Sequence, residues 1–172
     1  APTAVNDPLS SVAEDSGMRV ISFASLLAND STGPANESSQ TLTITGVSSV
    51  VGGTAVINGT DIEFTPDANF NGPASFDYTI QDNRLANGSP NSKTDIGTAT
   101  FTVSEVNDAP AATNDTLTSV AEDSSARVIS FASLLSNDST GPANESGQTL
   151  TITALSNVVG GTAVINGTSV EF

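Results

Sequence analysis

Nearly all the side chains of this protein that could do chemistry are carboxylates. The 172 residues include 19 Asp and Glu against 4 Lys and Arg, so the formal net charge is −15. There is no His and no Cys. This excludes Ser-His-Asp triads, cysteine nucleophiles, disulfides and the usual zinc sites. The chemistry that remains is that of oxygen atoms as ligands.

Adjacent carboxylates, Glu14 and Asp15, raise the question of glycosidase-type acid–base catalysis. Neighbouring residues of a strand point to opposite faces, so such a pair cannot converge on one substrate. No aromatic platform accompanies the pair to hold a sugar, and no His is present to activate a serine. We therefore expect no enzymatic activity.

The charge balance also excludes two classes of partner. The four basic residues, Arg19, Arg84, Lys93 and Arg127, cannot neutralise a phosphate backbone, so nucleic acid is excluded. Anionic lipid is excluded for the same reason. No segment approaches the length of apolar sequence that crosses a bilayer, so we expect no membrane insertion.

The acidic and amide side chains gather between the expected strands. Such a concentration of negative charge is unfavourable unless a cation offsets it. Ca²⁺ takes about six to eight oxygen ligands, and an all-oxygen donor set favours it over softer metals. Solvating loop charges are the alternative, because Asp and Asn are common in turns. We predict bound Ca²⁺, with candidate ligands Asp7, Glu14, Asp15, Asp30, Asp82, Glu105, Asn107, Asp108, Glu122, Asp123 and Asp138.

An internal repeat sets the domain organisation. Residues 1–64 align without gaps to residues 109–172, and 51 of the 64 positions are identical. This period is too long for a solenoid unit and fits a whole domain. The prediction is a complete repeat at 1–108, followed at 109–172 by the first, incomplete part of a near-identical repeat.

Seven short segments of the first copy read as strands, most of them alternating apolar and polar residues as in a sheet packed on one face. They are Leu9–Ala13, Met18–Ser22, Thr41–Thr45, Thr54–Ile57, Asp61–Phe64, Phe76–Ile80 and Thr100–Val103. Asn58-Gly59 predicts a hairpin between two of them, and Phe23–Leu27 predicts a short helical turn. The pattern indicates an all-β, Greek-key β-sandwich. Its predicted core is Leu42, Ile44, Val56, Ile62, Phe64, Phe76, Tyr78, Ile80, Phe101 and Val103.

Several motifs together resemble the bacterial cadherin-like tandem repeats of RTX-type adhesins and other large extracellular proteins. They are Val12–Asp15, Leu26–Asp30, Phe64–Gly72, Phe76–Tyr78 and Val106–Pro110. The resemblance covers both copies. It implies cadherin-like or Ig-like sandwiches in tandem, joined to neighbouring repeats of the same chain by Ca²⁺-stiffened joints. It also implies secretion to the bacterial cell surface and a structural role in adhesion or biofilm.

The resemblance further suggests roles for particular residues. Asn107 and Asp108 look like ligands of the linker between repeats, and Glu14 looks like the acidic residue near the first strand. Asp82 is expected to be an acidic partner from a strand end near the joint. The run Gly33–Glu37 departs from the closely spaced Asp residues that family members often carry there, which argues against a separate ion in that loop.

Two other functions stay open. A carbohydrate-binding module is the alternative, although most of the eight aromatic residues occupy inward-facing strand positions. The high identity of the two copies also makes homotypic association into fibres feasible, because near-identical strands can exchange.

Overall fold

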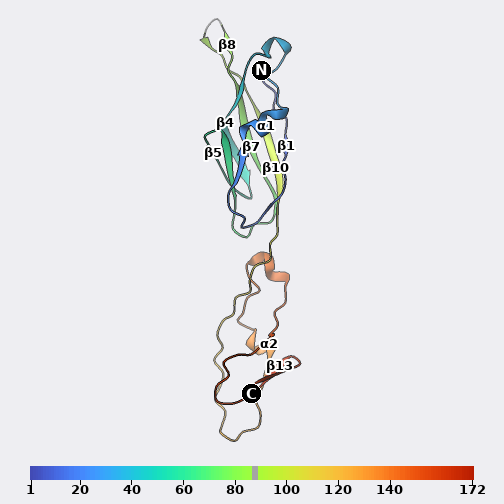
Figure 1. Ribbon diagram of the computed structural model, residues 1–172, viewed down its shortest axis with the longest axis vertical. Coiled ribbons are helices and arrows are strands. Elements are labelled where there is room, and N and C mark those ends of the chain that lie inside the picture. Colours follow the sequence, from blue (N-terminus) through green and yellow to red (C-terminus); the bar gives the residue numbers. More distant parts are fainter. Residues whose placement is uncertain (87–88) are drawn as a thin grey trace. The chain divides into compact units, whose positions relative to one another are not determined.

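Two long antiparallel strands, β7 (Gly72–Asp82) and β10 (Thr94–Ser104), organise the first part of the chain. The structure is a computed structural model. It describes the backbone of residues 1–86 and 89–172 and the side chains outside 85–90. The chain divides into Ala1–Val106, which we call unit 1, and Asn107–Phe172, which we call unit 2 (Figure 1).

The larger sheet of unit 1 has β7 and β10 at its centre. On one side β4 (Leu42–Val51) pairs antiparallel with β7. On the other side two short strands, β1 (Asp7–Pro8) and β2 (Val12–Ala13), run parallel to β10. The predicted strand at Leu9–Ala13 is therefore confirmed in its last two residues, and pairing also begins earlier, at Asp7.

The smaller sheet has the order β3 (Arg19–Ser22), β6 (Asp61–Pro66), β5 (Gly53–Asn58). The predicted hairpin is confirmed, with Asn58 opposite Asp61 and Gly59 at a positive φ of 62° that Gly tolerates. The predicted helical turn is also confirmed. It is α1 (Phe23–Leu26), and Oγ of Ser22 caps it by accepting from the N–H of Ser25.

Four further elements of unit 1 are short. They are the 3₁₀ turns η1 (Leu27–Asn29) and η2 (Ala35–Glu37), and the paired strands β8 (Leu85–Ala86) and β9 (Ser89–Pro90). The η2 turn carries a buried glutamate, Glu37.

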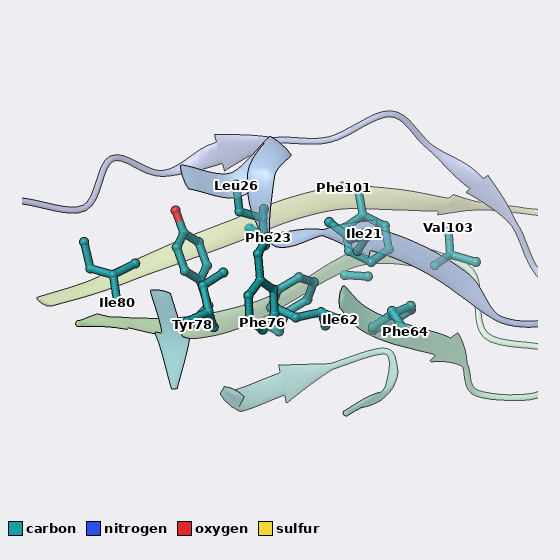
Figure 2. Packing of buried hydrophobic residues seen from close by; sticks show 13 residues of the cluster. Ile21, Phe23, Leu26, Ile62, Phe64, Phe76, Tyr78, Ile80, Phe101 and Val103 are labelled. Atoms are coloured by element: carbon teal, nitrogen blue, oxygen red, sulfur yellow. The ribbon is translucent and has the colours of Figure 1, made fainter. Parts of the chain in front are cut away.

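The core lies between the two sheets of unit 1. Figure 2 shows Phe76, Tyr78 and Ile80 projecting from β7 toward side chains of the second sheet and of α1. Phe101 packs edge-on against Phe64, with ring centroids 4.8 Å apart. Alternation along β7 and β10 explains this face, because every second residue is buried.

The core prediction is confirmed for eight residues: Ile44, Ile62, Phe64, Phe76, Tyr78, Ile80, Phe101 and Val103. The prediction that Val56 lies in the core is wrong, because this residue is 55% exposed. It sits on β5, an edge strand of the smaller sheet, where Ala55 is the residue packed against the core. Leu42 is only partly buried. The core also contains Ile21, Phe23, Leu26, Ala74 and Ala99.

Unit 2 forms only the counterpart of the smaller sheet. Its strands are β11 (Val128–Ser130), β13 (Ser169–Glu171) and β12 (Val164–Asn166), paired in that order. The helix α2 (Phe131–Leu134) and the 3₁₀ turn η3 (Ala143–Gly147) match α1 and η2. Residues 150–159, which correspond to β4, form no strand. In unit 1 β4 pairs with β7, and residues 109–172 include no counterpart of β7.

The fold is thus all-β, with unit 1 a β-sandwich. Among the residues that the structure describes, no helix is long and apolar enough to cross a membrane.

Candidate metal-binding clusters

The first acidic cluster of unit 1 lies beside β1 and contains Asp7, Asp30 and Asp95. The backbone N–H groups of two consecutive residues before β1 donate hydrogen bonds to two of these carboxylates. The N–H of Ala4 donates to Oδ2 of Asp95 at 2.9 Å. The N–H of Val5 donates to Oδ1 of Asp30 at 2.7 Å. The backbone before β1 therefore brings together carboxylates that are far apart in the sequence.

The electrostatics of this cluster centre on Asp30. Burial raises the pKa of its carboxyl above the ordinary value, and the charges of Asp7 and Asp95 raise the pKa further. The hydrogen bond from Val5 opposes this by lowering the pKa. Oδ2 of Asp30 is buried without a hydrogen-bond partner. A cation here would offset repulsion and satisfy that oxygen.

Asp7 itself has both carboxylate oxygens engaged. Nδ2 of Asn29 donates to Oδ1 at 3.0 Å, and the hydroxyl of Tyr78 donates to Oδ2 at 2.7 Å. Burial, and then the hydrogen bond to Asp7, raise the pKa of the Tyr78 hydroxyl well above its ordinary value. Asp7 therefore fastens β1 to the core through Tyr78, and a metal would compete with these bonds.

The second cluster lies where β7 ends. Oε1 of Glu37 accepts from Nη1 of Arg84 at 2.6 Å, and Oε2 accepts from the amino terminus of Ala1 at 3.0 Å. Oδ1 of Asp82 accepts backbone N–H groups from Arg84 and Lys93. Oδ2 of Asp82 is buried without a partner, and the residue is 2% exposed.

The third cluster lies where β10 ends. Glu14 is 2% exposed, and its Oε1 accepts the N–H of Val106 at 2.7 Å. Asp15 follows at a positive φ of 55°, and its Oδ1 accepts the N–H of Asn69 at 3.2 Å. Glu105 is exposed. Glu14 thus ties the end of β10 to the start of the unit.

The expected placement of Asp82 near residues 105–108 is wrong. Asp82 pairs with Lys93, which precedes β10, whereas Glu105 follows the end of β10. At about 3.3 Å per residue, the length of β10 separates the two by roughly 40 Å. Because β7 and β10 are antiparallel, the end of one meets the start of the other.

Unit 2 holds a buried glutamate beside the predicted linker residues. Glu145 is 1% exposed, and its Oε1 accepts the N–H of Asp108 at 3.0 Å. Oε2 of Glu145 is buried without a partner. Oδ1 of Asn107 accepts from Nε2 of Gln148 at 2.8 Å. The turn η3 therefore brings a carboxylate to Asn107 and Asp108.

The remaining predicted ligands of unit 2 lie apart. Oδ1 of Asp138 accepts the N–H of Thr113 at 2.7 Å, as Asp30 does in unit 1. Glu122 and Asp123 are exposed. Unit 2 thus repeats the Asp30 hydrogen bond.

Sequence reasoning missed four charged residues that the structure places in these clusters: Glu37, Arg84, Asp95 and Glu145. A signal existed for two of them, because the run Asn36-Glu37 recurs unchanged as Asn144-Glu145. For Asp95 no signal was present, since it sits within a long strand and faces Ala4 through the parallel pairing of β1.

The donor chemistry of these clusters fits Ca²⁺, because they consist of oxygen ligands and include three buried carboxylate oxygens without hydrogen bonds, on Asp30, Asp82 and Glu145. Within the described residues, however, no three His, Cys, Asp or Glu side chains come together in a group that could hold a metal ion. A bound Ca²⁺ would therefore draw further oxygens from amides, backbone carbonyls or water.

Comparison with known proteins identifies the domain type. The sequence model of the cadherin-like domain matches residues 1–103 and 106–170. No curated protein and no solved structure gives a significant match. The family suggests an adhesion-type structural module, generally non-enzymatic, typically extracellular and typically calcium-binding. The chain belongs to the cadherin-like domain family.

Proposed function

We propose that this chain is an extracellular, calcium-stiffened structural repeat of a bacterial adhesin or surface filament, supporting adhesion and biofilm. In this proposal residues 1–108 form a complete repeat and residues 109–172 the first part of the next. Neighbouring repeats of the same chain and Ca²⁺ ions are the partners, and the protein is secreted to the cell surface.

The observation that carries the calcium proposal is the set of buried carboxylate oxygens without partners. A carboxylate oxygen removed from water and left without a donor costs free energy, which a bound cation would recover. Asp30 has the strongest case, because two further carboxylates raise its pKa. Chelation should therefore destabilise unit 1 and restore the repulsion among Asp7, Asp30 and Asp95.

The proposed ligands group by unit. In unit 1, Asp30 and Asp95 would bind with Asp7 nearby, and Glu14 would bind with Asp15 and Glu105 at the end of β10. In unit 2, Glu145 would bind with Asn107 and Asp108, while Asp138 repeats the position of Asp30. Asp82 would bind at the end of β7, and Glu122 and Asp123 are the exposed counterparts of Glu14 and Asp15.

The aromatic residues favour a structural role over carbohydrate binding. Phe23, Phe64, Phe76, Tyr78, Phe101 and Phe131 are each 8% exposed or less. Phe70 packs against the core. Phe172 is the most exposed of the eight, at 40%. A platform that binds sugars needs exposed aromatic rings, and most of the aromatic rings of this chain are buried.

Homotypic association into fibres is a further part of the proposal. The edge strand β5 is the element that such pairing could use, because Val56 and Ile57 are 55% and 39% exposed there. Exposed apolar edges are templates for pairing with another chain.

Thermal unfolding with Ca²⁺, with Mg²⁺ and with a chelator tests the proposal. We expect Ca²⁺ to raise the midpoint and Mg²⁺ to raise it less, because Mg²⁺ demands a tighter octahedral site. Small-angle scattering should show a narrower distribution of molecular dimensions with Ca²⁺ than with the chelator. Equal melting temperatures and equal dimensions in all three conditions would contradict the calcium proposal. Glycan arrays run with Ca²⁺ test the alternative of a carbohydrate-binding module. Retention of the protein on a glycan would support that alternative.

A further inference from the structure

The tips of two equivalent hairpins carry the same pair of residues. The hairpin β5–β6 of unit 1 turns at Asn58-Gly59, and the hairpin β12–β13 of unit 2 turns at Asn166-Gly167. An asparagine that precedes a glycine loses its side-chain amide more easily than other asparagines do. The reason is that glycine has no Cβ to keep its backbone nitrogen away from the amide carbon. The two tips are therefore candidate sites of a covalent modification.

The backbone nitrogen of Gly59 is free to react. Gly59 is exposed at a φ of 62°, and a side chain added there would meet no atom within 4 Å. Within the part of the chain that the structure describes, no group accepts its N–H. The turn is fixed just beyond this residue, where the carbonyl oxygen of Thr60 accepts the N–H of Phe23 at 2.9 Å. Gly167 of unit 2 is equally exposed, at a φ of 60°.

A carboxylate holds the asparagine amide at each tip. Nδ2 of Asn58 donates to Oε1 of Glu63 at 2.7 Å, and Nδ2 of Asn166 donates to Oε1 of Glu171 at 2.6 Å. An anionic acceptor increases the electron density of the amide, so its carbon is attacked less readily and its nitrogen leaves less readily. The charge also opposes the negative charge that develops on the attacking nitrogen and on the carbonyl oxygen. Each glutamate therefore slows the loss of the amide.

The two tips differ by one charge. Asp61 lies directly opposite Asn58 in unit 1, whereas the matching residue of unit 2, Ser169, lies opposite Asn166. The Cβ atoms of residues directly opposite each other in an antiparallel pair are about 4.5–5.5 Å apart. The charge of Asp61 thus adds to that of Glu63, and Asn166 should react faster than Asn58.

The chain also contains an Asn-Gly pair that is held in a sheet. Gly72, which follows Asn71, is the first residue of β7 and pairs in register with Val103 of β10. Closing a ring between Gly72 and Asn71 would break that pairing, so this pair is an internal control. The pair Asn87-Gly88 lies outside the described residues.

We propose that Asn58 and Asn166 are sites of spontaneous deamidation, and that Asp61, Glu63 and Glu171 set its rate. The backbone nitrogen of the glycine attacks Cγ of the asparagine, and the new bond closes a succinimide ring. The bond from Cγ to Nδ2 breaks, and Nδ2 leaves as ammonia with the proton of the glycine N–H. Water then opens the ring at either carbonyl and gives aspartate or isoaspartate.

The product reverses the electrostatics of the unit 1 hairpin. A carboxylate at position 58 cannot donate to Glu63 and lies opposite Asp61, so a hydrogen bond is replaced by three like charges. Like charges directly opposite each other destabilise a strand pair. Isoaspartate also adds a carbon to the backbone, which disturbs the register of β5. We expect the reaction to loosen β5 from the edge of its sheet.

The test incubates the full 172-residue chain in mildly alkaline buffer and follows each Asn-Gly pair by peptide mapping and mass spectrometry. Deamidation is read as the mass gain of an amide-to-acid conversion. We expect Asn166 to react about two- to fivefold faster than Asn58, the factor that corresponds to one cross-strand charge pair. Asn71 should react more slowly than both.

Matched variants separate the charges. Glu63→Gln removes the charge but keeps an acceptor for Asn58, and it should speed the reaction at position 58 about two- to fivefold. Asp61→Ser places the residue of unit 2 in unit 1, and it should bring the rate of Asn58 close to that of Asn166. Neither variant should change the rates at positions 71 and 166.

A variant that mimics the product tests the consequence. Asn58→Asp should speed amide hydrogen exchange over residues 53–58 and leave residues 164–166 unchanged. The increase should be smaller when Asn58→Asp is combined with Asp61→Ser, because one of the three charges is then absent.

Three outcomes would overturn the proposal. The first is that positions 58 and 166 stay unmodified while position 71 reacts. The second is a rate at position 58 that Glu63→Gln and Asp61→Ser leave unchanged or lower. The third is equal hydrogen exchange over residues 53–58 in Asn58→Asp and in the unaltered chain.

Discussion

Arg84 donates from Nη1 to Oε1 of Glu37 at 2.6 Å, and the side chain of that glutamate is only 7% exposed. The pair joins two loops of unit 1, the η2 turn and the segment after β7. The second cation on Glu37 is the amino terminus of Ala1, at 3.0 Å. A loop glutamate that sequence patterns treat as solvated is thus a buried anchor with two positive partners.

The Arg84–Glu37 pair should stabilise unit 1 measurably. Arg84→Met is expected to lower the free energy of unfolding by about 1–3 kcal/mol, because it leaves a buried carboxylate with one cation fewer. The cost should fall short of a fully buried pair, since the Arg84 side chain is 39% exposed. Urea unfolding followed by Tyr78 fluorescence reports unit 1 alone, because the chain has one Tyr and no Trp.

A double-mutant cycle with Glu37→Gln isolates the pair. We expect the effects of Arg84→Met and Glu37→Gln to be clearly non-additive. Purely additive effects would show that the two side chains do not interact in solution.

Tyr78→Phe should destabilise unit 1 without disturbing its packing. The hydroxyl lies 2.7 Å from Oδ2 of Asp7 and 3.1 Å from the carbonyl oxygen of Val5. Its removal leaves a carboxylate that is 7% exposed short of a donor. The expected loss is about 1–3 kcal/mol in denaturant unfolding followed by circular dichroism. Much of that loss should disappear in the background of Asp7→Asn, and a full loss there would contradict the assignment.

Asp30→Asn should separate charge repulsion from calcium binding. In chelator, the variant should melt higher than the unaltered chain, because it removes a carboxylate whose pKa burial and the charges of Asp7 and Asp95 raise. The amide oxygen can still accept from Val5. With Ca²⁺, the variant should show a smaller rise in melting temperature.

The matched control for this experiment is Asp61→Asn, which removes the same charge at the β5–β6 hairpin of the other sheet. It should keep the full calcium response. If Asp30→Asn and Asp61→Asn respond to Ca²⁺ alike, Asp30 is not a ligand.

The sequence Thr-Leu-Thr-Ile-Thr occurs twice, at 41–45 and at 149–153, and should exchange its amide hydrogens at very different rates. The first occurrence lies almost wholly in β4 and pairs with β7, and the second forms no strand. We expect strong protection for the first and little for the second in hydrogen exchange. Equal protection of the two segments would show that unit 2 forms this strand by itself.

The sequence predicted much of the fold because local signals agreed with it. Alternation placed the long strands around Phe76–Ile80 and Thr100–Val103, and Asn58-Gly59 placed the hairpin. The prediction that Val56 belongs to the core was wrong. The alternation of side chains does not show that this strand lies at the edge of its sheet. At the edge of the smaller sheet, β5 turns that side chain to solvent.

The candidate clusters were less predictable, because their members meet through strand pairing. Asp95 reaches Asp30 only because residues before β1 bridge them. Asp82 was expected near the linker, and the antiparallel direction of β7 and β10 carries it to the other end. A carboxylate's neighbours depend on register and direction, which the sequence around it does not encode.

The sequence by itself determined an all-oxygen, carboxylate-rich chemistry, two near-identical copies and the strand pattern of a sandwich. The tertiary structure alone decided which carboxylates are buried and which are paired. The physical reason is that a strand is stabilised by its partner more than by its own residues. The four residues Leu42–Thr45 form a strand beside β7, and the identical residues 150–153 are irregular without it.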